Sequence, residues 1–179
     1  MDIIVRPQKF LDTKKENPVQ KGILSFLGKE YLCALGRGGM NVKESEGDGI
    51  TPLGTWPIRR GFYREDRIEK PKSCISFTPI TQNMGWCDAP QDLLYNQLVE
   101  LPFKSSHETL WRDDPLYDLI LVLGYNDDPV ISGKGSAIFM HIARQNYTPT
   151  AGCIALNQSD LLEIIINLTP TTSVQCVLE

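Results

Sequence analysis

Glycine and proline break this chain into short segments, and this is the strongest constraint on its fold. The 179 residues include 14 Gly and 12 Pro, and most apolar stretches between them are short. Such spacing favours strands, because helices usually need longer uninterrupted runs. We therefore predict a mostly β protein with candidate strands at residues 3–6, 23–27, 31–35, 54–58, 75–78, 116–123, 136–143, 152–156 and 173–178.

Two of these segments carry more specific patterns. The break at Gly28-Lys29-Glu30 predicts that residues 23–35 form a hairpin. The segment Leu119–Leu123 is apolar throughout, which is typical of a strand covered on both faces.

One helix is predicted near the C-terminus. Either Asn157 or Ser159 can cap its start, and Pro170 ends it. The apolar residues that recur at helical spacing on one side are Leu161, Leu162, Ile165 and Leu168.

The remaining middle region, residues 60–107, is rich in Pro, Asp and Arg with weak periodicity. We expect it to form long ordered loops, because no linker-like stretch separates it as a second domain. The predicted fold is a β-sandwich or partly closed sheet with one C-terminal helix. It forms a single domain over residues 1–179, with a motif-bearing core from about residue 22.

Composition limits the possible partners. The net charge is −4, and no basic block could follow a phosphate backbone, so no nucleic-acid partner is expected. The first apolar run, Ile3-Ile4-Val5, is too short for a signal peptide, and no later run predicts a membrane span. The sequence leaves open whether the protein stays in the cytoplasm or is exported, and it does not indicate the oligomeric state.

Cysteine and histidine are few and widely spaced. Five cysteines without a CxxC pair argue against a disulfide framework or a zinc knuckle, and we predict no metal site. His107 is interpreted as a solvated loop residue. The cysteines interpreted as buried packing residues are Cys33, Cys74, Cys87 and Cys176.

Cys153 and His141 are the strongest candidates for chemistry. Cys153 lies where a polar loop meets the predicted strand 152–156, and His141 lies twelve residues upstream in strand 136–143. If these strands are neighbours, the imidazole can face the thiol, lower its pKa and make it a nucleophile. Cys153 should then react with iodoacetamide near neutral pH faster than the other four thiols. The alternative is that Cys153 is a packing residue.

The two sequence blocks around these residues resemble the L,D-transpeptidase (YkuD-type) catalytic domain, in a compact branch of that family. The family has a histidine closing one strand, then a loop, then Ser/Thr-x-Gly-Cys, which His141 and Thr150-Ala151-Gly152-Cys153 match. The segment from Gly49 to Ile58 resembles the family's Thr-Pro-x-Gly-x-aromatic/Pro block. The stretches that resemble the compact branch are 38–40, 46–49, 124–126 and 135–139.

The resemblance implies that Cys153 attacks a peptidoglycan stem tetrapeptide, releases D-alanine and forms a thioester. An amine of a second stem then resolves the thioester into a cross-link. His141 would be the base, oriented by the backbone carbonyl after it, and the N–H groups of Gly152 and Cys153 would bind the oxyanion. Thr150 would support the loop. No metal or organic cofactor is implied, and the substrate implies work in the cell envelope.

The chain departs from the family pattern in its expected substrate contacts. Family members commonly have an arginine two residues after the nucleophile, where this chain has Ala155. Arg144 is the candidate replacement for holding a carboxylate, and a solvated loop charge is the alternative. Some family members use the first-position alanine as the donor, and the changed site would fit such a preference.

Three further residues are weaker candidates for the substrate cleft. Trp86 is either a loop aromatic over the substrate or a core residue. Tyr125 and Asn126 are also explained by the turn in which they lie. Arg64 and Asp66 are expected to pair with each other.

Two alternatives to transpeptidation remain open. The same Cys–His pair could serve an L,D-carboxypeptidase or amidase that hydrolyses wall peptides. The chain could also be a non-catalytic module that binds cell-wall peptides.

Overall fold

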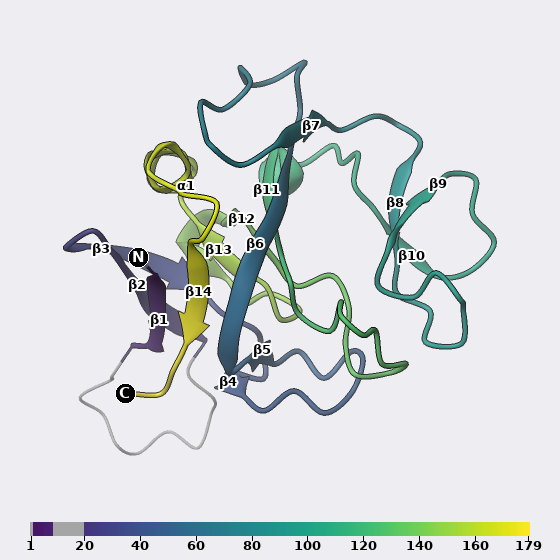
Figure 1. Cartoon of the computed structure of the whole chain (residues 1–179), viewed down its shortest axis with the longest axis horizontal. Helices are drawn as coiled ribbons and strands as arrows, with labels where there is room; N and C mark the ends of the chain where they lie inside the picture. Colours follow the sequence, from purple (N-terminus) through teal and green to yellow (C-terminus); the bar gives the residue numbers. More distant parts are fainter. Residues whose placement is uncertain (1, 9–19) are drawn as a thin grey trace.

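One large, closed sheet forms the body of the molecule (Figure 1). The computed structural model describes residues 2–8 and 20–179. Within these residues, the large sheet contains β1 (Ile3–Pro7), β2 (Lys21–Phe26), β3 (Lys29–Ala34), β6 (Gly54–Tyr63), β7 (Phe77–Pro79), β11 (Leu119–Leu123), β12 (Phe139–Ile142), β13 (Ile154–Leu156) and β14 (Ser173–Cys176). Each of the nine predicted strands overlaps one of these nine.

The sheet closes because its order, β11-β12-β13-β3-β2-β1-β14-β6-β7, is completed by antiparallel pairing of β11 with β6. Among the described strands of the large sheet, only β7 lies outside the closed ring, on the other side of β6. The mostly β prediction is confirmed, and the barrel-like closure means that the sandwich description fits only in part. The predicted hairpin is the β2–β3 pair, with Leu27 and Gly28 at positive φ in its turn.

The interior of the closed sheet holds the larger hydrophobic core. All eight strands of the ring contribute buried side chains to it. The helix α1 (Gln158–Ile166) packs Leu161, Ile164 and Ile165 into the same core, and the side chain of Asn157 caps its N-terminus, as predicted. Every residue of β11 is buried, which confirms that this strand is covered on both faces. No described helix is long and apolar enough to span a membrane.

A second, smaller core covers the outer face of β6, β11 and β12. It contains Phe62, Ile120 and Phe139 from these strands. A small sheet of β8 (Met84–Cys87), β9 (Leu98–Glu100) and β10 (His107–Thr109) lies beside the large sheet (Figure 1). Trp86 of β8 packs against Phe139 of β12. The candidate site lies on this outer side.

The structure corrects several predicted boundaries. Residues 60–107 are not only loops, because they contain the end of β6, β7 and the small sheet, and His107 is half-buried in a strand. Strand 116–123 begins only at Leu119, since Pro115–Tyr117 form a 3₁₀ turn capped by Asp114. Two short strands, β4 (Met40–Asn41) and β5 (Thr51–Pro52), and a second 3₁₀ turn, Gln145–Tyr147, were not predicted.

The single-domain organisation over residues 1–179 stays a prediction, and its segments 1 and 9–19 lie outside the described residues.

Close packing between β6 and β7 leaves no room for a side chain at position 61. Gly61 pairs with Phe77, and a Cβ added at Gly61 would overlap the buried Phe77 ring. Gly61→Ala should therefore lower the free energy of unfolding by about 1–3 kcal/mol in urea denaturation. Adding Phe77→Leu should recover part of that loss. An unchanged urea midpoint in Gly61→Ala would contradict this packing.

Candidate active site

The parallel pair β12–β13 places Cys153 and His141 on the same face. Met140 pairs with Ile154 and His141 with Ala155, so the two strands are neighbours, which is the condition that a Cys153–His141 pair requires. Alternate residues share a face, and Cys153 lies two residues before Ala155, so Cys153 and His141 both project to the outer face. Both side chains line a cavity of about 210 Å³.

A tight turn holds the backbone that carries Cys153. The hydroxyl of Thr150 donates to the carbonyl of Cys153 (2.7 Å) and accepts from the N–H of Gly152 (3.1 Å). Gly152 has a φ of 138°, and a Cβ there would lie 2.9 Å from the carbonyl of Ile50, so this position requires glycine. The Ile50 contact brings the 49–58 block against the Cys153 turn. The N–H of Gly152, predicted to face an oxyanion, is engaged by Thr150 in this structure.

The Cys153 thiol is buried and lies between two backbone groups. Its Sγ donates to the carbonyl of Ala137 (3.2 Å) and accepts from the N–H of Phe139 (3.4 Å). Burial raises the pKa of the thiol to about 12, and the negative charge of Glu108 adds to the rise. The expectation of a lowered thiol pKa is therefore wrong, because loss of hydration outweighs any stabilisation of the thiolate.

His141 is also buried, and its ring is held in one orientation. Nδ1 lies 2.9 Å from the carbonyl of Ile142, so Nδ1–H donates there and Nε2 is left as the basic nitrogen. The Tyr117 ring packs edge-on against the imidazole at 5.3 Å between centroids. Burial lowers the pKa of His141 to about 4, and the charges of Arg112 and Arg144 act in the same direction. At neutral pH the resting site therefore holds a neutral thiol and a neutral imidazole.

Two arginines on loops line the same cavity as Ala155. They are the predicted Arg144, which is exposed, and Arg112, which forms a double hydrogen bond to Asp114 (2.7 Å each). Arg112 also lies over the Tyr117 ring, 5.1 Å from its centroid.

A buried arginine, Arg64, holds the segment that carries Arg112 in place. Arg64 donates to the carbonyl of Arg112 (2.6 Å), stacks on Trp111 and pairs with Asp66 as predicted. Sequence reasoning missed Arg112, Tyr117 and Glu108, all of which line the Cys153 cavity. The available signal was the charged turn 111–115 directly before the buried strand β11.

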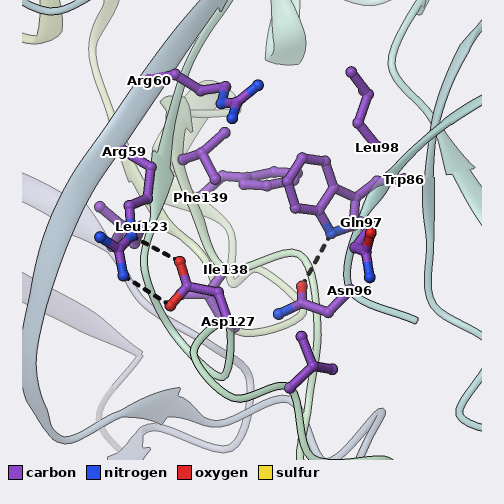
Figure 2. A pocket seen from close by; sticks show the side chains of 12 residues that line it. Arg59, Arg60, Trp86, Asn96, Gln97, Leu98, Leu123, Asp127, Ile138 and Phe139 are labelled. Atoms are coloured by element: carbon purple, nitrogen blue, oxygen red, sulfur yellow. Dashed lines mark hydrogen bonds and ion pairs between the residues drawn. The ribbon is translucent and has the colours of Figure 1, made fainter. Parts of the chain in front are cut away.

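Trp86 lines a second, larger cavity of about 500 Å³, shown in Figure 2. Its indole N–H donates to Asn96 (3.0 Å), and its ring packs edge-on against Phe139 at 5.2 Å between centroids. Trp86 therefore packs in the second core and also forms part of a cavity wall. On the opposite wall, Arg59 is paired with Asp127 (Figure 2).

Tyr125 and Asn126 do not line either of these cavities. Tyr125 packs edge-on against Trp56. The Asn126 side chain bonds the backbone of Ile131 and Gly135 and closes its own loop. The structure explains both residues by these contacts, and a role in substrate binding stays a prediction.

The closed β sheet and the cysteine and histidine on adjacent strands define a candidate thiol-dependent site. The family model of the L,D-transpeptidase catalytic domain (YkuD) matches residues 8–176, nearly the whole chain. The chain therefore belongs to this family of cysteine-dependent enzymes. No curated protein and no solved structure matches it.

The other cysteines divide into two groups, and this changes the expected thiol reactivity. Cys33, Cys87 and Cys176 are buried, as predicted, whereas Cys74 is exposed and is not a packing residue. Iodoacetamide at pH 7 should therefore modify Cys74 first, and not Cys153 as the sequence suggested. Peptide mapping by mass spectrometry should show Cys153 modification rising with pH to at least pH 10, since thiolate is the reacting form. Faster labelling of Cys153 than of Cys74 at pH 7 would contradict this assignment.

The lowered pKa of His141 predicts an acid-dependent loss of stability. The unfolded chain protonates this imidazole near pH 6.5 and the folded chain only near pH 4, so folding loses stability as the pH falls through that window. The loss from this group is about 3 kcal/mol. Between pH 7 and pH 4, the free energy of unfolding should thus fall less in His141→Gln than in the wild type. Parallel curves in urea titrations would exclude a buried neutral imidazole.

Proposed function

We propose that this protein is a peptidoglycan L,D-transpeptidase that joins stem peptides through a thioester on Cys153. The observation that carries this proposal is the shared cavity of Cys153 and His141, with Nε2 of the imidazole as the basic nitrogen. Family membership supports the substrate class, and that substrate implies work in the cell envelope.

Acylation begins with loss of the thiol proton. Nε2 of His141 takes this proton as Sγ attacks the donor carbonyl, since the resting pair is neutral. The N–H of Phe139, 3.4 Å from Sγ, stabilises the developing thiolate. The N–H of Cys153 binds the oxyanion, and the Gly152 N–H can join only if it leaves Thr150. His141 then returns the proton to the departing amine of D-alanine.

The thioester is resolved by an amine of a second stem peptide, whose proton passes to His141. Water in place of the amine gives the L,D-carboxypeptidase reaction, and the two reactions share every step up to the thioester. Which product forms therefore depends on whether an amine or a water molecule reaches the thioester.

Arg112 and Arg144 supply positive charge around Ala155, where related enzymes commonly carry an arginine. A guanidinium can hold a carboxylate through two parallel hydrogen bonds. We assign Arg144 to a substrate carboxylate because its side chain is exposed at the cavity. Arg112, already paired with Asp114, contributes longer-range attraction. Trp86 would contact the peptide in the larger cavity next to Phe139.

The proposal is tested with muropeptides that carry tetrapeptide stems, analysed by mass spectrometry. Wild type and Cys74→Ala should form cross-linked dimers with loss of D-alanine, and Cys153→Ala should form none. Replacement of the base in His141→Gln should slow D-alanine release by about 100-fold or more. Fragmentation of the dimers would identify the donor residue.

Two other results would change the assignment. Loss of D-alanine without dimers would indicate a carboxypeptidase. An unchanged stem with wild type would leave a thiol enzyme with another substrate or a non-catalytic binding module.

A further inference from the structure

Glu108 is a carboxylate in the wall of the cavity that contains the nucleophile. It lies in β10 and lines the same cavity as Cys153 and His141. Its negative charge opposes formation of the thiolate, because it raises the pKa of the Cys153 thiol. Removal of this charge would favour formation of the Cys153 thiolate. The presence of Glu108 is therefore best explained if its charge acts in another step of the reaction.

Tyr117 holds one oxygen of the Glu108 carboxyl in place. The hydroxyl of Tyr117 donates to Oε2 (2.6 Å), and the Tyr117 ring packs against His141, so the carboxyl is positioned relative to the imidazole. In the described part of the chain, no hydrogen bond reaches Oε1 and no salt bridge involves Glu108. Oε1 of Glu108 therefore has no cationic partner among the described residues, although Glu108 lines the same cavity as Cys153 and His141.

The charges around Glu108 are unequal. Arg112 is the positive group that lowers its pKa, while the negative charges of Asp88 and Glu46 raise it together with burial, which is the largest cause. The cavity wall therefore carries charges of both signs, with Arg112 and Arg144 on loops and Glu108 on β10. An added positive group would be stabilised beside Oε1 of Glu108, because no hydrogen bond in the described part of the chain reaches that oxygen.

We propose that Glu108 binds the primary ammonium group of the acyl acceptor and removes its first proton. This assignment rests on the proposed function and identifies the chemical class of the acceptor at the same site. A primary amine is protonated at neutral pH and cannot attack a carbonyl in that form. His141 is a weak base in this environment, since its pKa is lowered to about 4.

The proton and electron balance of the second step is then complete. The ammonium gives one proton to the Glu108 carboxylate, and the free amine attacks the thioester carbonyl to form the C–N bond. The C–S bond breaks with its electron pair on Sγ. The second amine proton passes to Nε2 of His141 and then to the thiolate, which restores the neutral pair. Glu108 releases its proton to solvent, so one ammonium and one thioester yield one amide, one thiol and one proton.

Water carries no positive charge, so this group favours amines over water as acceptors. The test compares the wild type with Glu108→Gln, which keeps an oxygen to accept from Tyr117 but removes the charge. The control is Glu100→Gln, which alters a carboxylate in β9 that bonds Asn83. Each protein is given a tetrapeptide-stem muropeptide as donor and a stem peptide with a free primary amine as acceptor, and cross-linked and hydrolysed products are quantified by mass spectrometry.

In Glu108→Gln, the KM for the acceptor should rise and the ratio of transfer to hydrolysis should fall by about 10-fold or more. The ratio should recover toward pH 10, where the free amine is abundant. Glu100→Gln should behave as the wild type. Tyr117→Phe, which frees the carboxyl from its anchor, should show a smaller change in the same direction, and thermal melting would confirm that each variant is folded.

An unchanged transfer-to-hydrolysis ratio in Glu108→Gln would overturn the assignment and leave the proposed function standing. Equal loss of D-alanine release and of transfer would show a purely structural role and would also overturn it. Absence of D-alanine release from the wild type would instead overturn the proposed function, and the acceptor assignment with it.

Discussion

The pairing of β12 with β13 is the constraint on which the candidate site depends. Both strands are short, and each is held on its other side by a further strand, β11 or β3. A shift of one residue would turn Cys153 toward the interior core and an apolar neighbour toward the cavity, so burial on both faces fixes the register. The closure of the sheet through β6 and β11 keeps β11 in place against β12. The position of Cys153 is thus a consequence of the whole ring of strands.

Burial dominates the electrostatics of this site. It raises the pKa of the Cys153 thiol and lowers that of the His141 imidazole, so both shifts favour the neutral forms. A thiolate–imidazolium pair would need further interactions to compensate for this loss of hydration. The same loss of hydration strengthens each charge–dipole contact made with a bound peptide. Reactivity of this arrangement is therefore expected to arise with the substrate in place, and it is not a property of the free thiol.

The sequence predicted segments that overlap all nine strands of the large sheet, and it offered Asn157 as one of two possible helix caps. These features follow from local patterns of apolar residues and from turn chemistry. It did not predict β8, β9 and β10, because the region that contains them is rich in proline and charged residues and has weak periodicity. It also missed Glu108, Arg112 and Tyr117, because contacts between loops far apart in sequence bring them to the site. The thiol pKa was predicted in the wrong direction for the same reason: its cause is burial by distant segments.

The inner face of the sheet packs the larger core that stabilises the fold, and the outer face carries the candidate site. The interior core draws on all eight strands of the ring and on α1, whereas the outer face carries the candidate nucleophile Cys153, the candidate base His141 and the residues around them. Glu108, Arg112 and Arg144 reach the cavity from the small sheet and from loops, and none belongs to the interior core. Substitutions at these three positions can change the charge of the cavity while the register of β12 and β13 is kept. Position 155 illustrates this separation, because Ala155 brings no charge and positive charge reaches the same cavity from Arg112 and Arg144 on two loops. Under the proposed function, acceptor and donor preference can therefore change without any change to the closed sheet or to the pairing of β12 with β13.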